Sequence, residues 1–105
     1  MTIAEFYKKD GELTGFKVKG HSGHSEQGND IVCASVSSAV MLTANLITEI
    51  FGFKADVSAV GDTVSLKTDI SCNDILQGLY RGLVMQLEEI AEEFHKNLKV
   101  KFTEV

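Results

Sequence analysis

The chain has 105 residues, 44% of them hydrophobic, and a formal net charge of −5 at pH 7. A chain of this length buries roughly 65% of its unfolded surface in one core, so we predict a single domain over residues 1–105. Because no basic cluster is longer than Lys8-Lys9, we expect no direct contact with nucleic acid.

The same composition argues against secretion and membrane insertion. The first residues lack the basic start and apolar run of a signal peptide. The most apolar stretch, residues 31–51, is interrupted by polar residues such as Ser35 and Asn45, which favours a helix buried in a domain over a membrane span. We therefore expect a cytoplasmic protein with no membrane contact.

The N-terminal quarter predicts a β-hairpin. Residues 2–8 are rich in β-branched and aromatic side chains, and the Asp-Gly pair that follows is a strong signal for a tight turn. In residues 13–21, Phe16 and Val18 alternate with lysines, the period of two of a strand with one buried face. Gly20 then allows a turn or a close backbone approach at the end of this strand.

A polar loop and a long apolar helix come next. Residues 22–29 contain glycines and no large apolar side chain, so we expect a flexible loop that covers the active site. From about residue 31 to 51, apolar residues recur at spacings of three and four, which is typical of a packed helix. Gly52 is expected to end it.

The second half predicts two strands, a helix and a last strand. Residues 55–60 and 63–67 flank a Gly-Asp turn, and Ser71 is expected to cap a second amphipathic helix. Val100 and Phe102 then alternate with lysines, as in a strand that joins the centre or the edge of the sheet. The order ββαββαβ predicts an α/β (α+β) fold, a mixed and mainly antiparallel sheet packed with two helices.

Two residues of the loop and helix suggest nucleophilic chemistry. His21 ends the second strand and Cys33 lies near the start of the long helix, so a loop that folds back can bring an imidazole to a thiol. Asn29 or Asp30 is expected to cap this helix. If Asp30 is the cap, Cys33 is the third helical residue. A helix N-terminus and a nearby imidazolium favour the thiolate, and first-turn amides can hold an oxyanion.

Other interpretations of these residues stay open on the sequence alone. Cys33 also lies on the apolar stripe of its helix, where a cysteine is usually an inert core residue. His21, His24, Cys33 and Cys72 are residue types that bind zinc, although their spacing is not that of a compact structural site. A thiol redox sensor would need Cys72 as its partner, but we predict that Cys72 is structural and that His95 is solvated.

The segment from Gly20 to Ser37 carries a resemblance to a known family. Gly20-His21, followed by the pattern Gly-x-Asp-Ile-Val-Cys-Ala-x-Val-Ser over residues 28–37, resembles the ribosomal-processing cysteine protease family Prp. The resemblance covers essentially the whole chain. It implies a catalytic dyad of Cys33 as nucleophile and His21 as proton acceptor and donor, with Asp30, Ser37 and Gly20 as supporting residues.

The resemblance also implies a substrate. Members of the family remove a short N-terminal extension from a large-subunit ribosomal protein by cutting after a Phe-Phe pair, and they are homodimers with a flexible loop over the active site. Position 24 varies in the family, so His24 inherits no catalytic role. The resemblance implies neither a cofactor nor a metal ion.

A cut after phenylalanine requires an apolar pocket for the ring, which we predict between the loop and the helix near Val36 and Val40. Asp30 then either orients His21 or only caps the helix, and Ser37 lies one turn beyond Cys33 on the same face. Two alternatives to an endopeptidase remain: a non-catalytic ribosome-associated module that binds the peptide, and a thiol redox or metal protein.

Overall fold

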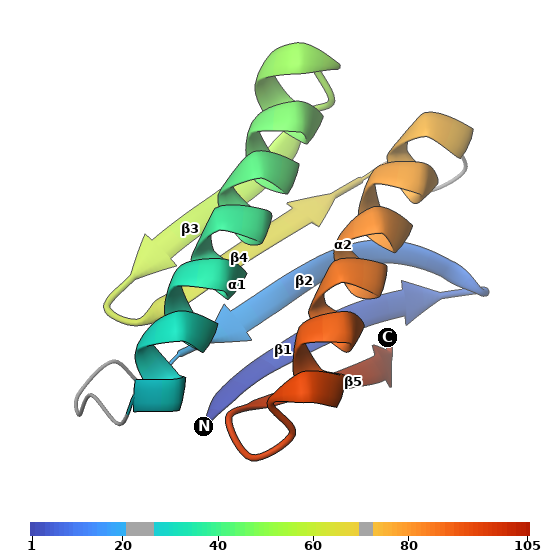
Figure 1. The fold of residues 1–105 in the computed structure, drawn as a ribbon. Coiled ribbons are helices and arrows are strands. Elements are labelled where there is room, and N and C mark those ends of the chain that lie inside the picture. Colours follow the sequence, from blue (N-terminus) through green and yellow to red (C-terminus); the bar gives the residue numbers. More distant parts are fainter. Residues whose placement is uncertain (21–26, 70–72) are drawn as a thin grey trace.

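The element order of the chain is ββαββαβ, as the sequence predicts. The computed structural model describes residues 1–20, 27–69 and 73–105, and within the range 27–30 it describes the backbone only. Five strands and two long helices make up the fold (Figure 1). The elements are β1 (Thr2–Lys9), β2 (Glu12–Lys19), α1 (Gln27–Asn45), the π-helical turn η1 (Leu46–Ile50), β3 (Ala55–Val60), β4 (Thr63–Thr68), α2 (Asp74–Glu93) and β5 (Leu98–Glu104).

The five strands form one mixed sheet in the order β3-β4-β2-β1-β5. All neighbours are antiparallel except β1 and β5, which are parallel, so the predicted mainly antiparallel sheet is confirmed. The last strand, which the sequence placed at the centre or the edge, is an edge strand. Both helices lie on the same face of the sheet, and the other face is open (Figure 1).

The first hairpin turns where the sequence predicts. Asp10 and Gly11 have φ angles of 53° and 80°, the left-handed conformation that a two-residue hairpin turn requires. The register shifts between Tyr7 and Lys8, because Lys8 pairs with Leu13 while Tyr7 pairs with Gly15. This bulge changes the pairing at the start of β2.

The core lies between the sheet and the two helices. Phe6 and Phe16 pack with their ring centroids 6.1 Å apart, and Phe16 meets Tyr80 of α2 edge to face at 6.3 Å. Val36 and Val40 of α1 and Ile47 of η1 are buried in the core, which confirms most of the predicted stripe. Phe51 at its end is 47% exposed, contrary to the prediction of a buried stripe through residue 51.

Helix α1 begins earlier than the sequence predicts. It starts at Gln27 rather than near Ile31, so Asn29 and Asp30 lie inside the helix and do not cap it. The extra turn contains no apolar residue, and hydrophobic periodicity therefore could not reveal it. The C-terminal end agrees with the prediction, since Gly52 adopts a φ of 68° directly after the helix.

Helix α2 is capped by Asn73, and not by Ser71 as predicted. The Asn73 side-chain oxygen accepts hydrogen bonds from the backbone N–H groups of Ile75, at 2.9 Å, and Leu76, at 3.1 Å. Ser71 itself lies outside the described residues. The cap directly precedes the first helical residue, where an asparagine satisfies the exposed amides as well as a serine does.

Candidate active site

Cys33 is half-buried in the second turn of α1. It is six residues beyond Gln27, so the prediction that it is the third helical residue is wrong. The amides without a helical partner belong to the first four residues of a helix. They therefore lie one turn before the thiol rather than around it, and the prediction that first-turn amides around Cys33 hold an oxyanion loses its basis.

Cys33 lines a pocket of about 250 Å³ at one end of the sheet. Helix α1 forms one wall of the pocket. The start of β1 and the end of β2 form a second wall, and the turn between β3 and β4 forms a third. The lining residues are Thr2, Val18, Gly20, Cys33, Val36, Ser37, Val40, Met41, Gly61, Asp62 and Val64. Most of these side chains are apolar, so the pocket suits an apolar group placed beside a thiol.

Backbone hydrogen bonds hold the strand walls of the pocket together. The N–H of Gly20 donates to the carbonyl of Asp62 at 3.0 Å, which ties the end of β2 to the turn between β3 and β4. In the sheet register Val18 pairs with Val64, so both valines face the helix side beside the pocket. Gly61 takes a φ of 59° and makes the tight turn that brings Asp62 to this position.

Among the described residues, none comes close enough to Gly20 to require a glycine there. A Cβ built there would lie 3.8 Å from the Thr2 hydroxyl oxygen and 4.0 Å from the Asp62 carbonyl oxygen, which are ordinary contacts. Among the described residues, the close backbone approach that the sequence suggested for Gly20 is therefore not seen. Its role in the pocket is the hydrogen bond that its backbone donates.

Several predicted site residues come together at this pocket. Val36 and Val40, predicted to bind the substrate side chain, are 3% and 4% exposed and form its base beside Cys33. Ser37 is exposed and lines the same pocket, one helical turn beyond the cysteine. Asp30 is a residue of the first turns of α1, and its side chain is not described.

Other predicted residues lie outside the described residues. They are His21, His24, Cys72 and the loop that the sequence placed at 22–29, apart from the helical backbone of its last three residues. Residues 27–29 belong to α1, which corrects the predicted end of the loop. His95 is exposed, as predicted. Within the described part of the chain, no three His, Cys, Asp or Glu side chains cluster as metal ligands.

Sequence reasoning missed the contribution of other elements to the pocket. Met41 follows Val40 on α1 and is 64% exposed, and Asp62 and Gly61 come from a distant turn. No local pattern marks Gly61 and Asp62, because they reach the pocket only through the pairing of β2 with β4. The sequence signal was limited to residues adjacent to Cys33 along the helix.

A half-buried thiol in the wall of an open pocket can reach a bound ligand, as the nucleophile of a cysteine hydrolase must. The comparison with known families agrees. Residues 1–99 match the model of the family described as Cysteine protease Prp, and the chain belongs to this family.

The relatives of the chain carry the same description. The chain is 26% identical over 104 residues to the Ribosomal processing cysteine protease Prp of Staphylococcus aureus strain NCTC 8325, covering 97% of this chain and 98% of the relative. It is 28% identical over 97 residues to the protein of that name from Bacillus subtilis strain 168, covering 87% of each.

Solved structures confirm the fold. The Prp protease of S. aureus in complex with a substrate peptide superposes with a TM-score of 0.91 at 24% identity, over 98% of this chain and 100% of the other. The same protease with a covalently linked product peptide has a TM-score of 0.88 at 25% identity, with the same coverage.

Proposed function

We propose that this protein is a cytoplasmic cysteine endopeptidase that removes the N-terminal extension of a large-subunit ribosomal protein by cutting after a Phe-Phe pair. The observation that carries the proposal is the position of Cys33 in the wall of an apolar pocket, in a chain of the Prp protease family. The ribosomal substrate is supported by the names of the relatives, which are ribosomal processing proteases.

The proposed reaction uses a dyad of Cys33 and His21. His21 takes the thiol proton, and the Cys33 sulfur attacks the carbonyl carbon of the scissile peptide bond. The imidazolium then gives its proton to the leaving amine, and a thioester remains on the enzyme. Water, deprotonated by the same imidazole, releases the carboxylate product and restores the thiol. The exposed hydroxyl of Ser37 lines the same pocket and can hydrogen-bond to the bound peptide.

The pocket beside Cys33 fits the proposed phenylalanine side chain. Val36 and Val40 form its base, and Val64 from β4 stands opposite them. An aromatic ring buried among these side chains would be removed from water, which supplies affinity without any charged contact. This explains how a chain with little polar lining at the site can select an aromatic residue before the cut.

We also propose that the protein is a homodimer that pairs through α1. Over Ile31–Ile50 this helix has a mean hydropathy of 1.8, apolar and long enough by composition to cross a membrane, yet only 28% of that window is buried. Met41, Leu42 and Ile50 are each more than 60% exposed. Large exposed apolar side chains gathered on one helix favour an interface there.

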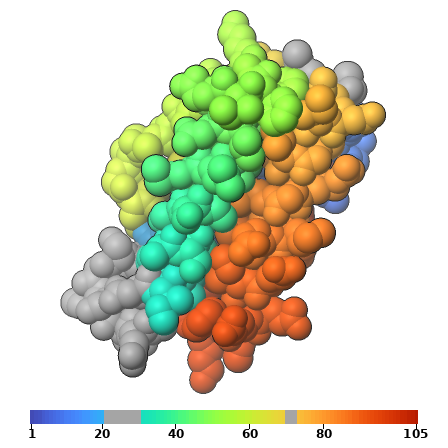
Figure 2. All heavy atoms as spheres, turned by 45° about the horizontal axis from the view of Figure 1, so that its top comes forward, coloured from blue at the N-terminus to red at the C-terminus, as the bar shows by residue number. Residues whose placement is uncertain are grey.

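A groove between the two helices extends this surface. It has a volume of about 740 Å³ and lies where α1 and α2 run side by side (Figure 2). Gly78 and Gly82 of α2 line it, and a Cβ at either position would meet no described atom within 4 Å. Within the described part of the chain nothing packs closely against these glycines, and a second copy can use the space.

Sedimentation of two matched variants tests the dimer. We expect Leu42→Glu to sediment as a monomer, because a charge at the centre of the apolar surface cannot be buried in the pair. Val60→Glu places the same charge at a residue that is 72% exposed on the open sheet face and should leave a dimer. A dimer that persists in Leu42→Glu would contradict the use of this surface.

The function is tested by cleavage of a peptide copied from the extended N-terminus of the host's ribosomal protein. Mass spectrometry should find one cut after Phe-Phe for the wild type, and a loss of rate of about a thousandfold or more in Cys33→Ala and in His21→Ala. The control is Cys72→Ala, which should cleave at the wild-type rate.

The outcomes separate the alternatives. If the wild type binds the peptide and leaves it intact, the protein is a non-catalytic binding module. If Cys33→Ala still cleaves the peptide, Cys33 is not the nucleophile. Zinc in the purified protein, or reversible oxidation of Cys33 without cleavage, would favour the metal or redox alternative.

A further inference from the structure

The open face of the sheet carries more than half of the basic residues of this acidic chain. Side chains alternate along each strand, so the residues that pair with Glu5, one position from buried Ala4 and Phe6, face away from the helices. Lys9 pairs with Glu12 at the hairpin end of this face. The other lysines on the face are Lys17 and Lys19 of β2, Lys67 of β4, and Lys99 and Lys101 of β5. All five are exposed. The chain has ten lysines and arginines in all.

Strand register places the lysines of β2, β4 and β5 in three adjacent rows. Lys99 and Lys19 flank Ile3 in the first row, and Lys101 and Lys17 flank Glu5 in the second. Lys67 pairs with Gly15 in the third row. Since neighbouring strands are about 4.8 Å apart, lysines on either side of β1 lie about 10 Å apart at the backbone. Their flexible side chains span one continuous surface.

Among the described residues, two carboxylates lie in these three rows, and one of them is already bound. Glu5 accepts a hydrogen bond from the Thr103 hydroxyl at 2.5 Å, and the Lys101 ammonium lies 3.9 Å from the same oxygen. The hydrogen bond from Thr103, aided by Tyr7 and Lys101, lowers the pKa of Glu5 below its ordinary value. The other carboxylate, Asp56, lies on the edge strand β3. The face therefore has a net positive charge.

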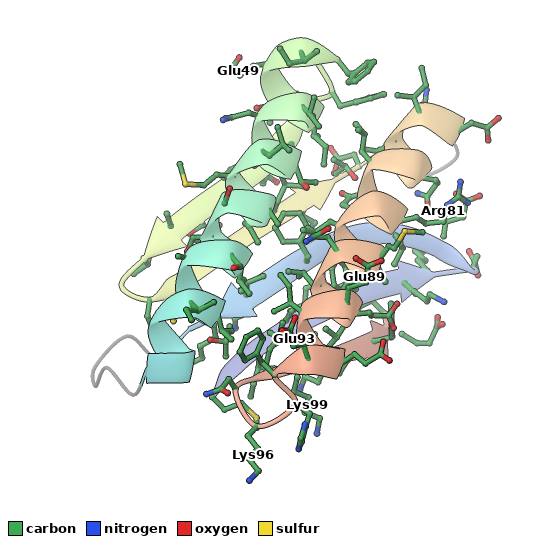
Figure 3. The ribbon with its side chains drawn as sticks, in the orientation of Figure 1. Glu49, Arg81, Glu89, Glu93, Lys96 and Lys99 are labelled. Carbon is green, nitrogen blue, oxygen red and sulfur yellow. The ribbon has the colours of Figure 1, made fainter. Side chains whose placement is uncertain are left out.

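The negative charge lies on the other side of the molecule. Exposed carboxylates gather along α2, in the helix layer, and they include the labelled Glu89 and Glu93 (Figure 3). Lys99 lies near the start of β5 in the same view. The expectation that an acidic chain avoids nucleic acid treats charge as evenly spread. In the folded protein the lysines of β2, β4 and β5 gather on the open sheet face, and a group of carboxylates gathers on α2.

The remaining side chains of the face are mostly small and hydroxylated. Thr63, Ser65, Ser58 and Thr103 occupy the same rows as the lysines. Protein interfaces are depleted of lysine and serine at their centres, whereas lysines and hydroxyls are common contacts to phosphate. The apolar side of α1 fits a protein partner, and this face does not.

We propose that the open sheet face docks on the phosphate backbone of RNA, which positions the protease beside a ribosomal protein that is itself bound to RNA. This inference rests on the proposed function for its biological setting. The face is on the opposite side of the sheet from the helix-side pocket that contains Cys33, so RNA and the substrate peptide can bind together.

Two matched double variants test the proposal. Lys67→Gln with Lys99→Gln removes two charges from the face, and Arg81→Gln with Lys96→Gln removes two charges from α2 and the loop after it. Binding of a short labelled RNA duplex is measured by fluorescence anisotropy at about 50 and 150 mM KCl. We expect the sheet variant to bind several-fold more weakly and to reduce the slope of log affinity against log salt by about two. The control should stay within about twofold of the wild type.

Cleavage distinguishes a failure of this inference from a failure of the proposed function. Both variants should cut the free peptide at the wild-type rate, and the sheet variant alone should show a raised KM when the ribosomal protein is bound to its RNA. Equal weakening of RNA binding in both variants, or no binding by the wild type at low salt, would overturn the RNA site even if peptide cleavage is normal. Equal competition by an acidic polypeptide would point to a protein partner instead.

Discussion

The residues at the two ends of β2 make different kinds of contact. At its start, backbone groups of Leu13 and Thr14 enter a buried hydrogen-bond network with α2 and β4. At its end, Val18 and the adjacent Gly20 line the pocket of Cys33, where most side chains are apolar and the space between them is open. One strand thus connects a closed polar junction to an open apolar site.

The polar junction uses two side chains of α2. The Gln77 amide accepts from the N–H of Leu13 at 2.9 Å and donates to its carbonyl at 2.7 Å. The Tyr80 hydroxyl lies 2.6 Å from that of Thr68 and donates to the Thr14 carbonyl at 3.1 Å. Among the described residues, every buried side-chain nitrogen and oxygen has a partner. This end fixes the helix layer on the sheet, and the pocket end can keep an opening for a ligand.

The largest effect is expected from Gln77→Leu. Two buried backbone groups of Leu13 would lose their partner, and at roughly 1–3 kcal/mol each the free energy of unfolding should fall by about 4 kcal/mol. Urea denaturation measures the loss. Gln86→Leu, at an exposed position of the same helix, is the matched control and should change stability by less than about 0.5 kcal/mol. A loss below about 1 kcal/mol at Gln77 would show that water replaces the amide.

A slightly smaller effect is expected from alkali, through Tyr80. Burial raises the pKa of its phenol to about 12, whereas the unfolded group titrates near 10. Below about pH 10 the phenol is neutral in both states, so its contribution to stability is complete. Between about pH 10 and 12 the unfolded chain loses this proton first, and the protein should lose about 3 kcal/mol of stability. The urea midpoint of unfolding is measured against pH for the wild type and for Tyr80→Phe. The wild-type midpoint should fall more steeply between about pH 10 and 12, and equal slopes would contradict the prediction.

The smallest effect is expected at the pocket end, from Val40→Leu. The added methylene would narrow the pocket and reduce kcat/KM for a substrate with phenylalanine before the cut by roughly tenfold, mainly through KM. Stability should change by less than about 1.5 kcal/mol, because open space adjoins the side chain. Val60→Leu on the open sheet face should leave both quantities unchanged. An unaltered KM in Val40→Leu would mean that the phenylalanine binds elsewhere.

Hydrophobic periodicity predicted most of the fold, because the strands and helices each bury one apolar face. It missed the roles of Gln77 and Tyr80, because polar residues on a buried face do not contribute to an apolar pattern. Their hydrogen-bond partners in β2, the carbonyls of Leu13 and Thr14, are also more than fifty residues away in the sequence. The start of α1 was missed for a related reason, since its first turn is polar. Short-range patterns identified the helices and strands, but they could not identify the polar side chains that join α2 to the sheet or the residue at which α1 begins.

The candidate site was predictable only in part. Cys33, Ser37, Val36 and Val40 lie on one helix at spacings that the sequence shows directly, and they do share a pocket. Asp62 joins them through a strand register that no local pattern contains. The segregation of charge was equally hidden, because a net charge sums residues that strand pairing places on opposite faces.

The parallel pairing of β5 with β1 has a consequence for synthesis. Thr2 of the first strand aligns with Leu98 of the last, so the edge of β1 stays uncovered until almost the entire domain has been translated. An uncovered strand edge can recruit strands from other chains. A nascent chain of this protein therefore exposes the edge of β1 until β5 has been synthesised, and β5 then becomes the edge strand.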